Sequence, residues 1–447
     1  MNEEQGLDST RRITSSDDLE VSACLEISQE KAGHGPATEG EMSPQRESIL
    51  IVDFGSQYSR LIARRVRENS VYCEIISFNT NWSEVEGLNP KGIILSGGPA
   101  SVYDETSPLA PLWVFESGLP ILGICYGMQV LVHQLGGKVA ASTKKEYGHA
   151  VLHQNKPNEP LFTGLPQSLS VWMSHADQVT ELPPGFVSMA HTDNSPIAVV
   201  GNDKGILGIQ FHPEVAHTPQ GSNIIENFLT KTCNMGQTWT PDNFVVDSVN
   251  RIREQVGKGK VICALSGGVD SAVAATLVHK AVGDQLTCIF VNNGLMRRGE
   301  PDRVRETFEK YMDINLIFSE STERFLTGLA GVIDPERKRK IIGEEFINVF
   351  DEEALKLGVV DFLTQGTLYP DVIESKTSDN SVSATIKTHH NVGGLPDHMK
   401  MELVEPLRYL FKDEVRQVGL ELGLPEEMVF RQPFPGPGLA IRIIGEV

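Results

Sequence analysis

Residues 261–278 read VICALSGGVDSAVAATLV. The apolar run 261–265 predicts a buried strand and the run 272–278 predicts a helix, so the glycines between them form a tight strand-to-helix turn. Such a turn presents free backbone N–H groups at the positive end of a helix dipole, where anions such as phosphate bind. Asp270 can hold the Mg²⁺ that accompanies a nucleotide. Because the turn lacks the lysine of a Walker A loop, we expect another mode of nucleotide binding.

The rest of the chain alternates apolar strands with helices. Strands are predicted near residues 48–55, 72–76, 92–95, 121–124, 208–211, 286–291 and 315–318, and helices near 109–116, 243–255 and 412–422. This alternation predicts an α/β protein with two doubly wound domains, each with a mainly parallel central sheet flanked by helices. Ligands bind such sheets at the carboxyl ends of the strands, so the residues that follow each strand are candidates for function.

Composition narrows the class of protein. With 447 residues the chain is long enough for two or three domains. Its formal net charge of −20 argues against nucleic-acid binding, and because no run reaches about 18 apolar residues, no membrane span is expected. Six cysteines without CxxC spacing fit a reducing cytoplasm. Residues 1–47 carry eleven Asp and Glu against four Lys and Arg, which predicts a disordered acidic tail.

Cys125 comes directly after the predicted strand 121–124 and opens a helix. A cysteine on such a turn is exposed at the end of the sheet, and the helix N-terminus favours its thiolate. A buried core cysteine is the alternative for Cys125 taken alone. The strand at 208–211 delivers His212 as a base, and Glu214 can orient its imidazole. The three residues together predict a nucleophile, a base and an orienting carboxylate.

A backbone loop can complete this site. The segment Ser96–Pro99 follows its own predicted strand, and the N–H of Gly98 can donate to an oxyanion. The N–H of Tyr126, next to Cys125, is the expected second donor. The sequence therefore predicts an oxyanion hole beside the nucleophile.

Three motifs, SGGP, GICYGMQ and QFHPE, resemble the class I glutamine amidotransferase family in order and spacing over roughly residues 49–235. The resemblance implies a domain over residues 48–237 in which Cys125 attacks the side-chain amide of glutamine and releases ammonia. It also implies a glutamine pocket lined by Gln129, His175 and Asp177. For His175, a surface loop histidine is an equal alternative.

A second domain is expected over residues 238–432. After a short predicted strand, Asp371 and Glu374 are available to a metal. Lys387 stands among histidines and glycines and suits a mobile lid over phosphates. The basic run Arg337–Lys340, placed before a helix, indicates either a solvated face or part of a phosphate pocket.

Five motifs, LSGGVDS, QGTLYPDVIES, KTHHNVGGLP, EPLRYLFKDEVR and PFPGPGLAIR, resemble the ATP-pyrophosphatase domain of the GMP synthase family. With the first domain, the resemblance covers about residues 48–447 and implies ATP and Mg²⁺ as cofactors. The implied ATP contacts are Ser266, Gly267, Gly268, Val269, Asp270, Ser271, Ala272 and Lys387. The implied metal ligands are Asp270 and Asp371, and Arg297 is the implied XMP contact. Asn292 stands where the family commonly has Asp, which weakens the expectation of a carboxylate on the nucleotide there.

The resemblance implies a ligase that adenylates XMP with ATP and then displaces AMP with ammonia from glutamine to give GMP. Its partners would be the small molecules glutamine, XMP and ATP, without nucleic acid or membrane. The family is homodimeric through a C-terminal domain, of which residues 433–447 are only the start. We therefore expect a fragment or truncated product that binds XMP poorly and exposes apolar surface near Pro433–Ile444.

Other functions remain open at this point. NAD synthetases and asparagine synthetase-like enzymes share the glycine turn, but the fused amidotransferase motifs and PFPGPGL disfavour them. A tRNA-modifying thiolase would need paired catalytic cysteines and a basic face, which the sequence lacks. The last alternative is a truncated chain that acts only as a glutaminase or as a regulatory binding module.

Overall fold

The computed structural model describes residues 46–156, 159–378, 401–432 and 438–447. These residues form two compact units that divide between Thr240 and Pro241. The predicted acidic tail, apart from its last two residues, and Lys387 lie outside the described residues. Among the helices that are described, none has the length and apolar character needed to cross a bilayer.

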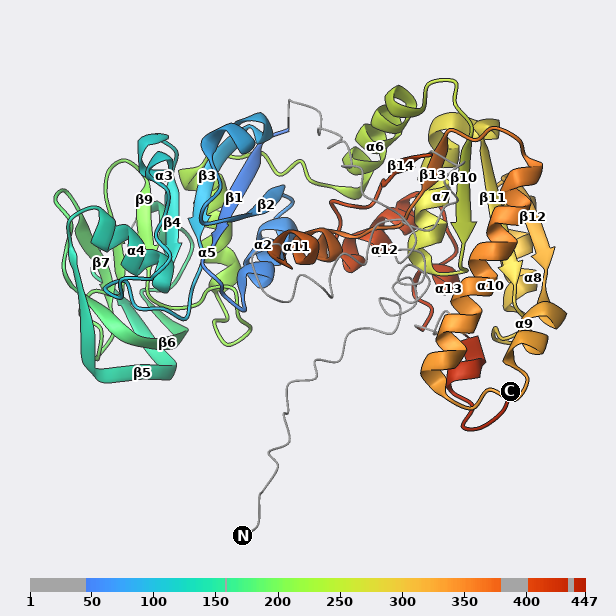
Figure 1. Cartoon of the computed structure of the whole chain (residues 1–447). Helices are drawn as coiled ribbons and strands as arrows, with labels where there is room; N and C mark the ends of the chain where they lie inside the picture. Colours follow the sequence, from blue (N-terminus) through green and yellow to red (C-terminus); the bar gives the residue numbers. More distant parts are fainter. Residues whose placement is uncertain (1–45, 157–158, 379–400, 433–437) are drawn as a thin grey trace, which may run out of the picture. The chain divides into compact units, whose positions relative to one another are not determined.

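The described part of residues 46–240 contains a nine-stranded sheet in the order β2-β1-β3-β4-β9-β8-β7-β5-β6 (Figure 1). From β2 to β9 in this order the strands are parallel, and from β9 to β6 they are antiparallel. The strands are β1 (Ser48–Asp53), β2 (Cys73–Ser77), β3 (Pro90–Leu95), β4 (Ile121–Ile124), β5 (Lys138–Gln154), β6 (Ser168–Glu181), β7 (Val187–His191), β8 (Val199–Gly201) and β9 (Ile206–Ile209). The expected doubly wound sheet is confirmed, with an antiparallel extension that the sequence analysis did not predict.

The α-helices of this unit accompany a sheet whose central strands β1 and β4 are buried on both faces. They are α2 (Ser59–Glu68), α3 (Leu112–Glu116), α4 (Tyr126–Gln134) and α5 (Gly221–Asn227). In β1, Leu50 and Val52 join the core cluster that includes Val130 of α4, and the alternate residues Ile49 and Ile51 are also fully buried. A strand buried on both sides reads as a continuous apolar run, and for this reason the sequence predicted β1 and β4 well.

The described part of residues 241–447 contains a five-stranded, all-parallel sheet in the order β12-β11-β10-β13-β14. Its strands are β10 (Val261–Leu265), β11 (Leu286–Asn292), β12 (Asn315–Glu320), β13 (Phe362–Thr364) and β14 (Glu402–Val404). The chain runs from β10 outward to β12 and then returns to the other side of β10 with β13. In open α/β sheets ligands bind where the strand order reverses, which here is at the carboxyl ends of β10 and β13.

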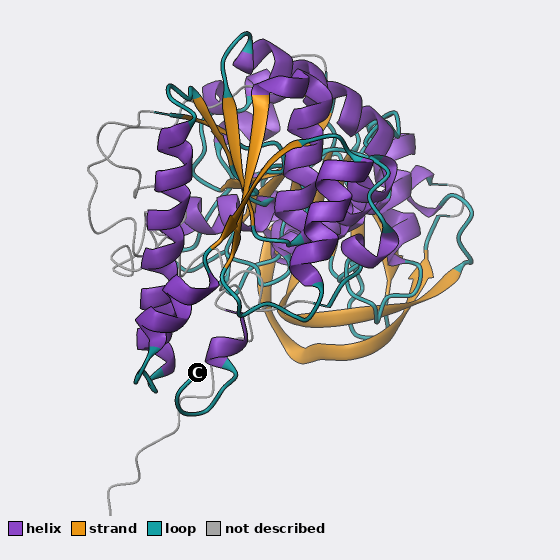
Figure 2. Ribbon diagram, turned by 90° about the vertical axis from the view of Figure 1, so that its right-hand side faces the viewer, coloured by secondary structure: helices purple, strands orange, loops and turns teal. Residues whose placement is uncertain are grey.

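Helices cover both faces of this second sheet (Figure 2). They are α6 (Pro241–Val256), α7 (Val269–Val282), α8 (Glu300–Arg305), α9 (Thr322–Leu329), α10 (Pro335–Lys356), α11 (Tyr369–Ser378), α12 (Lys412–Glu421) and α13 (Glu426–Val429). Helix α7 packs on β10, β11 and β13 and also contacts α6 and α12, whereas α10 packs on β11 and β12 and contacts α9. The strand and helix that were predicted to flank the glycine turn are β10 and α7.

The basic run Arg337–Lys340 differs from its prediction, because it lies inside α10 and not before a helix. The helix begins at Pro335, and the Asp334 side chain caps it by accepting from the Arg337 amide at 2.8 Å. Lys338 is fully buried, and its Nζ donates to three backbone carbonyls at 2.7 to 3.0 Å, those of Ala440, Ile443 and Gly445. Lys338 therefore holds the last residues of the chain and is not available to a phosphate.

Candidate active sites

Cys125 occupies a strained turn between β4 and α4. Its φ of 53° and ψ of −106° form a backbone conformation that residues other than glycine rarely adopt. The turn is tight because glycines stand on both sides of it: a Cβ on Gly123 would meet the Gly127 carbonyl oxygen at 2.7 Å, and a Cβ on Gly127 would meet the Leu95 oxygen at 2.3 Å. A strained strand-to-helix turn of this kind places a nucleophile at the end of a parallel sheet.

The predicted base and its orienting carboxylate lie beside the thiol. His212 hydrogen-bonds with Cys125, and its Nδ1 lies 2.7 Å from Glu214 Oε1. Both side chains are buried. Burial would lower the pKa of His212, but hydrogen bonds with the Cys125 thiol and the Glu214 carboxylate raise it to about 10. The structure thus brings together the three residues that the sequence placed about 90 positions apart.

The backbone on either side of His212 is also fixed. The His212 amide donates to the Trp172 carbonyl at 3.0 Å, and the His212 carbonyl accepts from Thr218 Oγ1 at 2.6 Å. The Tyr58 ring meets the imidazole edge to face, with centroids 5.6 Å apart. These contacts leave the imidazole little freedom to leave the thiol.

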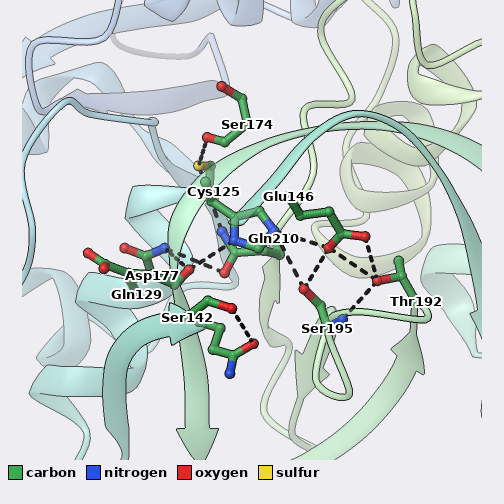
Figure 3. A network of polar contacts seen from close by, with 11 residues as sticks. Cys125, Gln129, Ser142, Glu146, Ser174, Asp177, Thr192, Ser195 and Gln210 are labelled. Carbon is green, nitrogen blue, oxygen red and sulfur yellow. Dashed lines mark hydrogen bonds and ion pairs between the residues drawn. The ribbon is translucent and has the colours of Figure 1, made fainter. Parts of the chain in front are cut away.

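The sequence analysis missed Gln210, which contacts the nucleophile. Gln210 is fully buried, and its Nε2 donates to Cys125 Sγ at 3.7 Å (Figure 3). The thiol in turn donates to the Ser174 carbonyl at 3.7 Å. Gln210 stands directly after β9, between the apolar residues Ile209 and Phe211, and this was a signal that could have found it, because a buried amide needs partners.

The loop predicted to donate to an oxyanion lies against the start of α4. A Cβ added to Gly98 would meet Cδ1 of Tyr126 at 2.9 Å, so this loop packs directly on the Tyr126 ring. The Tyr126 amide is the first of α4, and amides in a first helical turn have no acceptor within the helix. The loop that carries Gly98 thus packs on the residue whose amide is the second predicted donor.

The residues predicted to line the glutamine pocket form a buried group. The backbone oxygen of Asp177 accepts from Gln129 Nε2 at 3.1 Å and lies 3.0 Å from His175 Nδ1. The Asp177 carboxylate accepts from the hydroxyls of Ser101 and Tyr103. Of the two alternatives for His175, the surface loop histidine is wrong, because this residue lies in β6 and is only 4 % exposed.

The glycine turn of the second unit has the geometry of an anion cradle. Gly267 has a φ of +76°, and Gly268 directly precedes α7. The Ser266 and Ser271 hydroxyls lie 3.1 Å apart, and Ser266 Oγ accepts from the Gly268 amide at 3.2 Å. The N-terminus of α7, with Val269 to Ala272 in its first turn, thus stands at the carboxyl end of β10, where a phosphate would meet backbone N–H groups.

Charged side chains surround this turn. Lys412 Nζ lies 2.7 Å from Asp270 Oδ2, and Arg431 pairs with Glu300. A Cβ on Gly267 would come within 3.5 Å of both the Glu300 and the Arg431 side chains, so this pair borders the turn directly. Lys412, the first residue of α12, was not predicted from the sequence. It brings a cation to a glycine turn that lacks the lysine of a Walker A loop.

The other predicted contacts of the second site are only partly placed. Arg297 donates through a guanidinium nitrogen to the Gln432 carbonyl at 3.0 Å. Asp371 Oδ2 accepts from the Leu368 amide at 3.0 Å near the start of α11. In the part of the chain that is described, no three His, Cys, Asp or Glu side chains gather as a metal site. Asp270 still fits Mg²⁺, which usually binds one or two carboxylates together with substrate phosphates.

Family models match parts of both units. The class I glutamine amidotransferase family matches residues 50–232, and the tRNA methyl transferase HUP domain matches residues 259–310. A GMP synthase (glutamine-hydrolysing) of Dehalococcoides mccartyi is 60% identical over 424 residues, which cover 95% of this chain and 80% of that protein. The enzyme of the same name from Thermomicrobium roseum is 57% identical over 406 residues, covering 91% and 77%.

The structure of a putative GMP synthase subunit of Thermoplasma acidophilum is 31% identical, with a TM-score of 0.40, and the match covers 42% of this chain and 95% of that one. The family of this chain is shown by curated relatives that are 56 to 60% identical to it over at least 90% of its length.

Proposed function

This chain belongs to the family of glutamine-hydrolysing GMP synthases, and we propose that its two units perform the two halves of that reaction. The chain is a carbon–nitrogen ligase that uses glutamine to aminate XMP. ATP, XMP, glutamine and water give AMP, diphosphate, GMP and glutamate. The comparisons lend no support to the alternative of a glutaminase or regulatory module alone.

In the first unit we assign glutamine hydrolysis to Cys125, His212 and Glu214. The raised pKa of His212 suits the imidazole to take the proton of the Cys125 thiol as the sulfur attacks the side-chain carbon of glutamine. His212 then gives its proton to the departing ammonia, and water hydrolyses the glutamyl thioester. Glu214 holds the imidazole through Nδ1 so that Nε2 faces the reacting atoms.

The amides of Gly98 and Tyr126 would stabilise the oxyanion that forms in this attack. The Asp177 carboxylate, already an acceptor for Ser101 and Tyr103, would bind the α-ammonium group of glutamine. Gln129 and His175 support Asp177 by donating to its backbone oxygen.

In the second unit we assign ATP to the turn Ser266–Ala272. Its backbone amides and hydroxyls would cradle the pyrophosphate, and Asp270 would hold Mg²⁺, which neutralises charge on the phosphates when bound. The 2-oxygen of XMP attacks the α-phosphorus of ATP, diphosphate departs, and ammonia then displaces AMP. Arg297 is our candidate contact for the XMP phosphate, and Asp371 is the second candidate metal ligand.

The observation that carries this proposal is the position of His212 between Cys125 and Glu214, and Cys125→Ala tests it. The variant should lose glutamine-dependent GMP formation by about three or more orders of magnitude, because removing a triad member has that effect. Ammonia-dependent formation should stay within about twofold, since ammonia bypasses the thiol. An equal loss with both nitrogen sources would show that Cys125 is not the glutaminase nucleophile.

A further inference from the structure

A buried carboxylate near the glutamine site takes no part in the chemistry above. Glu146 of β5 is only 6 % exposed, although its side chain ends in a carboxyl group. Its Oε1 accepts from Thr192 Oγ1 at 2.9 Å, and its Oε2 accepts from Ser195 Oγ at 2.8 Å (Figure 3). Burying a carboxylate costs desolvation free energy unless hydrogen bonds compensate for it, so a buried carboxylate is a candidate for a functional role.

Glu146 faces His175 across the β5–β6 ladder. The two residues are register partners, and His175 Nε2 lies 3.4 Å from Glu146 Oε2. The other ring nitrogen, Nδ1, faces the Asp177 carbonyl at 3.0 Å. Burial lowers the pKa of His175 and favours a neutral ring, which donates a hydrogen bond from only one nitrogen. Ser195 Oγ also lies 3.5 Å from Nε2, so polar groups flank the ring on two sides and a turn of the ring would break the hydrogen bond that it donates.

The strand segment 174–177 connects this network to the reacting atoms. Its Ser174 carbonyl accepts from Cys125 Sγ, and its Asp177 carbonyl accepts from Gln129 as well as meeting His175. The Asp177 side chain is the proposed receptor for the glutamine α-ammonium group. A shift of this segment would therefore move the receptor relative to the thiol.

We propose that Glu146 is a positioning residue for glutamine binding: it fixes His175, and through His175 the segment 174–177, at the distance from Cys125 that glutamine requires. The hydroxyls of Thr192 and Ser195 donate hydrogen bonds to the Glu146 carboxylate and thereby hold it against the turn after β7. The proposal rests on the glutaminase assignment of the first unit. It concerns the fit of the substrate and not the reactivity of the thiol.

Glu146→Gln keeps the shape of the side chain but removes its charge. The KM for glutamine should rise roughly tenfold, since the loss of one hydrogen bond to a charged group is worth about a factor of ten, whereas kcat should stay within about threefold. Two thiol reagents separate fit from reactivity. A chloromethyl ketone analogue of glutamine should inactivate the variant roughly tenfold more slowly, while iodoacetamide, which needs no glutamine pocket, should react within about twofold of the wild-type rate.

Matched variants complete the test. Glu181→Gln removes an exposed carboxylate from the same strand pair, where it pairs with Lys138, and should change neither rate. Ser195→Ala is a smaller change that keeps Glu146, and it should slow inactivation by the glutamine analogue by about threefold. This variant tests the proposal if Glu146→Gln does not fold. Wild-type rates with both reagents at Glu146→Gln, or an equal fall with both, would overturn the proposal. Failure of the wild-type enzyme to react with the analogue would instead overturn the glutaminase assignment itself.

Discussion

Replacing Glu214 with Gln tests how much of the first site depends on one buried ion pair. Glu214 Oε1 lies 2.7 Å from His212 Nδ1, and both side chains are at most 6 % exposed. Among the described residues, Glu214 Oε2 has no hydrogen-bond partner, so the carboxylate is directed at the imidazole alone. Gln has the same shape, and the variant therefore removes charge with little change in packing.

The expected magnitude follows from the burial of the pair. Removing one partner of a buried ion pair costs about 3–5 kcal/mol, which corresponds to a fall of about 10²–10⁴ in the glutamine-dependent rate if the loss is felt in the transition state. The pKa of His212 should fall from about 10, because burial lowers it and one of the two groups that raise it is gone.

Two measurements check this expectation. GMP formation is followed with glutamine and with ammonia as nitrogen source, and the His212 ring is titrated by NMR. Glu181→Gln, an exposed carboxylate on β6, is the control for loss of charge. The reasoning would be refuted by a glutamine-dependent rate within about tenfold of wild type, or by a pKa that stays near 10 in the variant.

Three further results are expected. Asp270→Ala should abolish AMP formation from ATP while hydrolysis of glutamine continues, because a methyl group cannot hold Mg²⁺; normal AMP formation by the folded variant would remove the glycine turn as the ATP site. Lys338→Met should lower the free energy of unfolding by about 3 kcal/mol, because three carbonyls lose their shared donor, whereas the exposed Lys340→Met should change it by less than about 0.5, as urea titration would show. Because the pKa of His212 is raised on folding, its contribution to stability is fully present below about pH 6.5 and is lost as pH rises through about 10; the difference in Tm between wild type and Glu214→Gln should shrink over this range, and a constant difference would contradict the raised pKa.

Much of the fold was predictable because its central strands are short and apolar, and because candidate site residues follow them directly in the sequence. The run 121–124 became β4 with unchanged bounds, and the strand at 261–265 became β10. Such a strand can be recognised from its own residues, since a strand that is buried on both faces reads as a continuous apolar run whatever strands lie beside it. The same holds for the turns after them, where glycine is required by close backbone approach, as at Gly127 against Leu95.

The antiparallel extension of the first sheet was missed although a signal was present. In β6, Leu169, Val171 and Met173 are buried and alternate with more exposed residues. That alternation is typical of a strand with one buried face, and it could have predicted β6 and the inward position of His175. His175 lies in the middle of β6 and not directly after an apolar run, so its position could not be inferred from the end of a buried strand, as it was for Cys125.

The sequence by itself predicted the apolar strands β1, β4 and β10 and the turns after β4 and β10, and it singled out Cys125, His212 and Glu214, because each of these follows from residues that are neighbours along the chain. Only the tertiary structure decided that Glu146 faces His175, that Gln210 reaches the thiol, and that Lys338 is buried rather than solvated. The physical reason is the same in each case. A charged or polar side chain can be buried only where distant backbone or side-chain groups satisfy it, and those partners, 29 to 107 positions away in these three cases, come into place only when the sheets and helices pack.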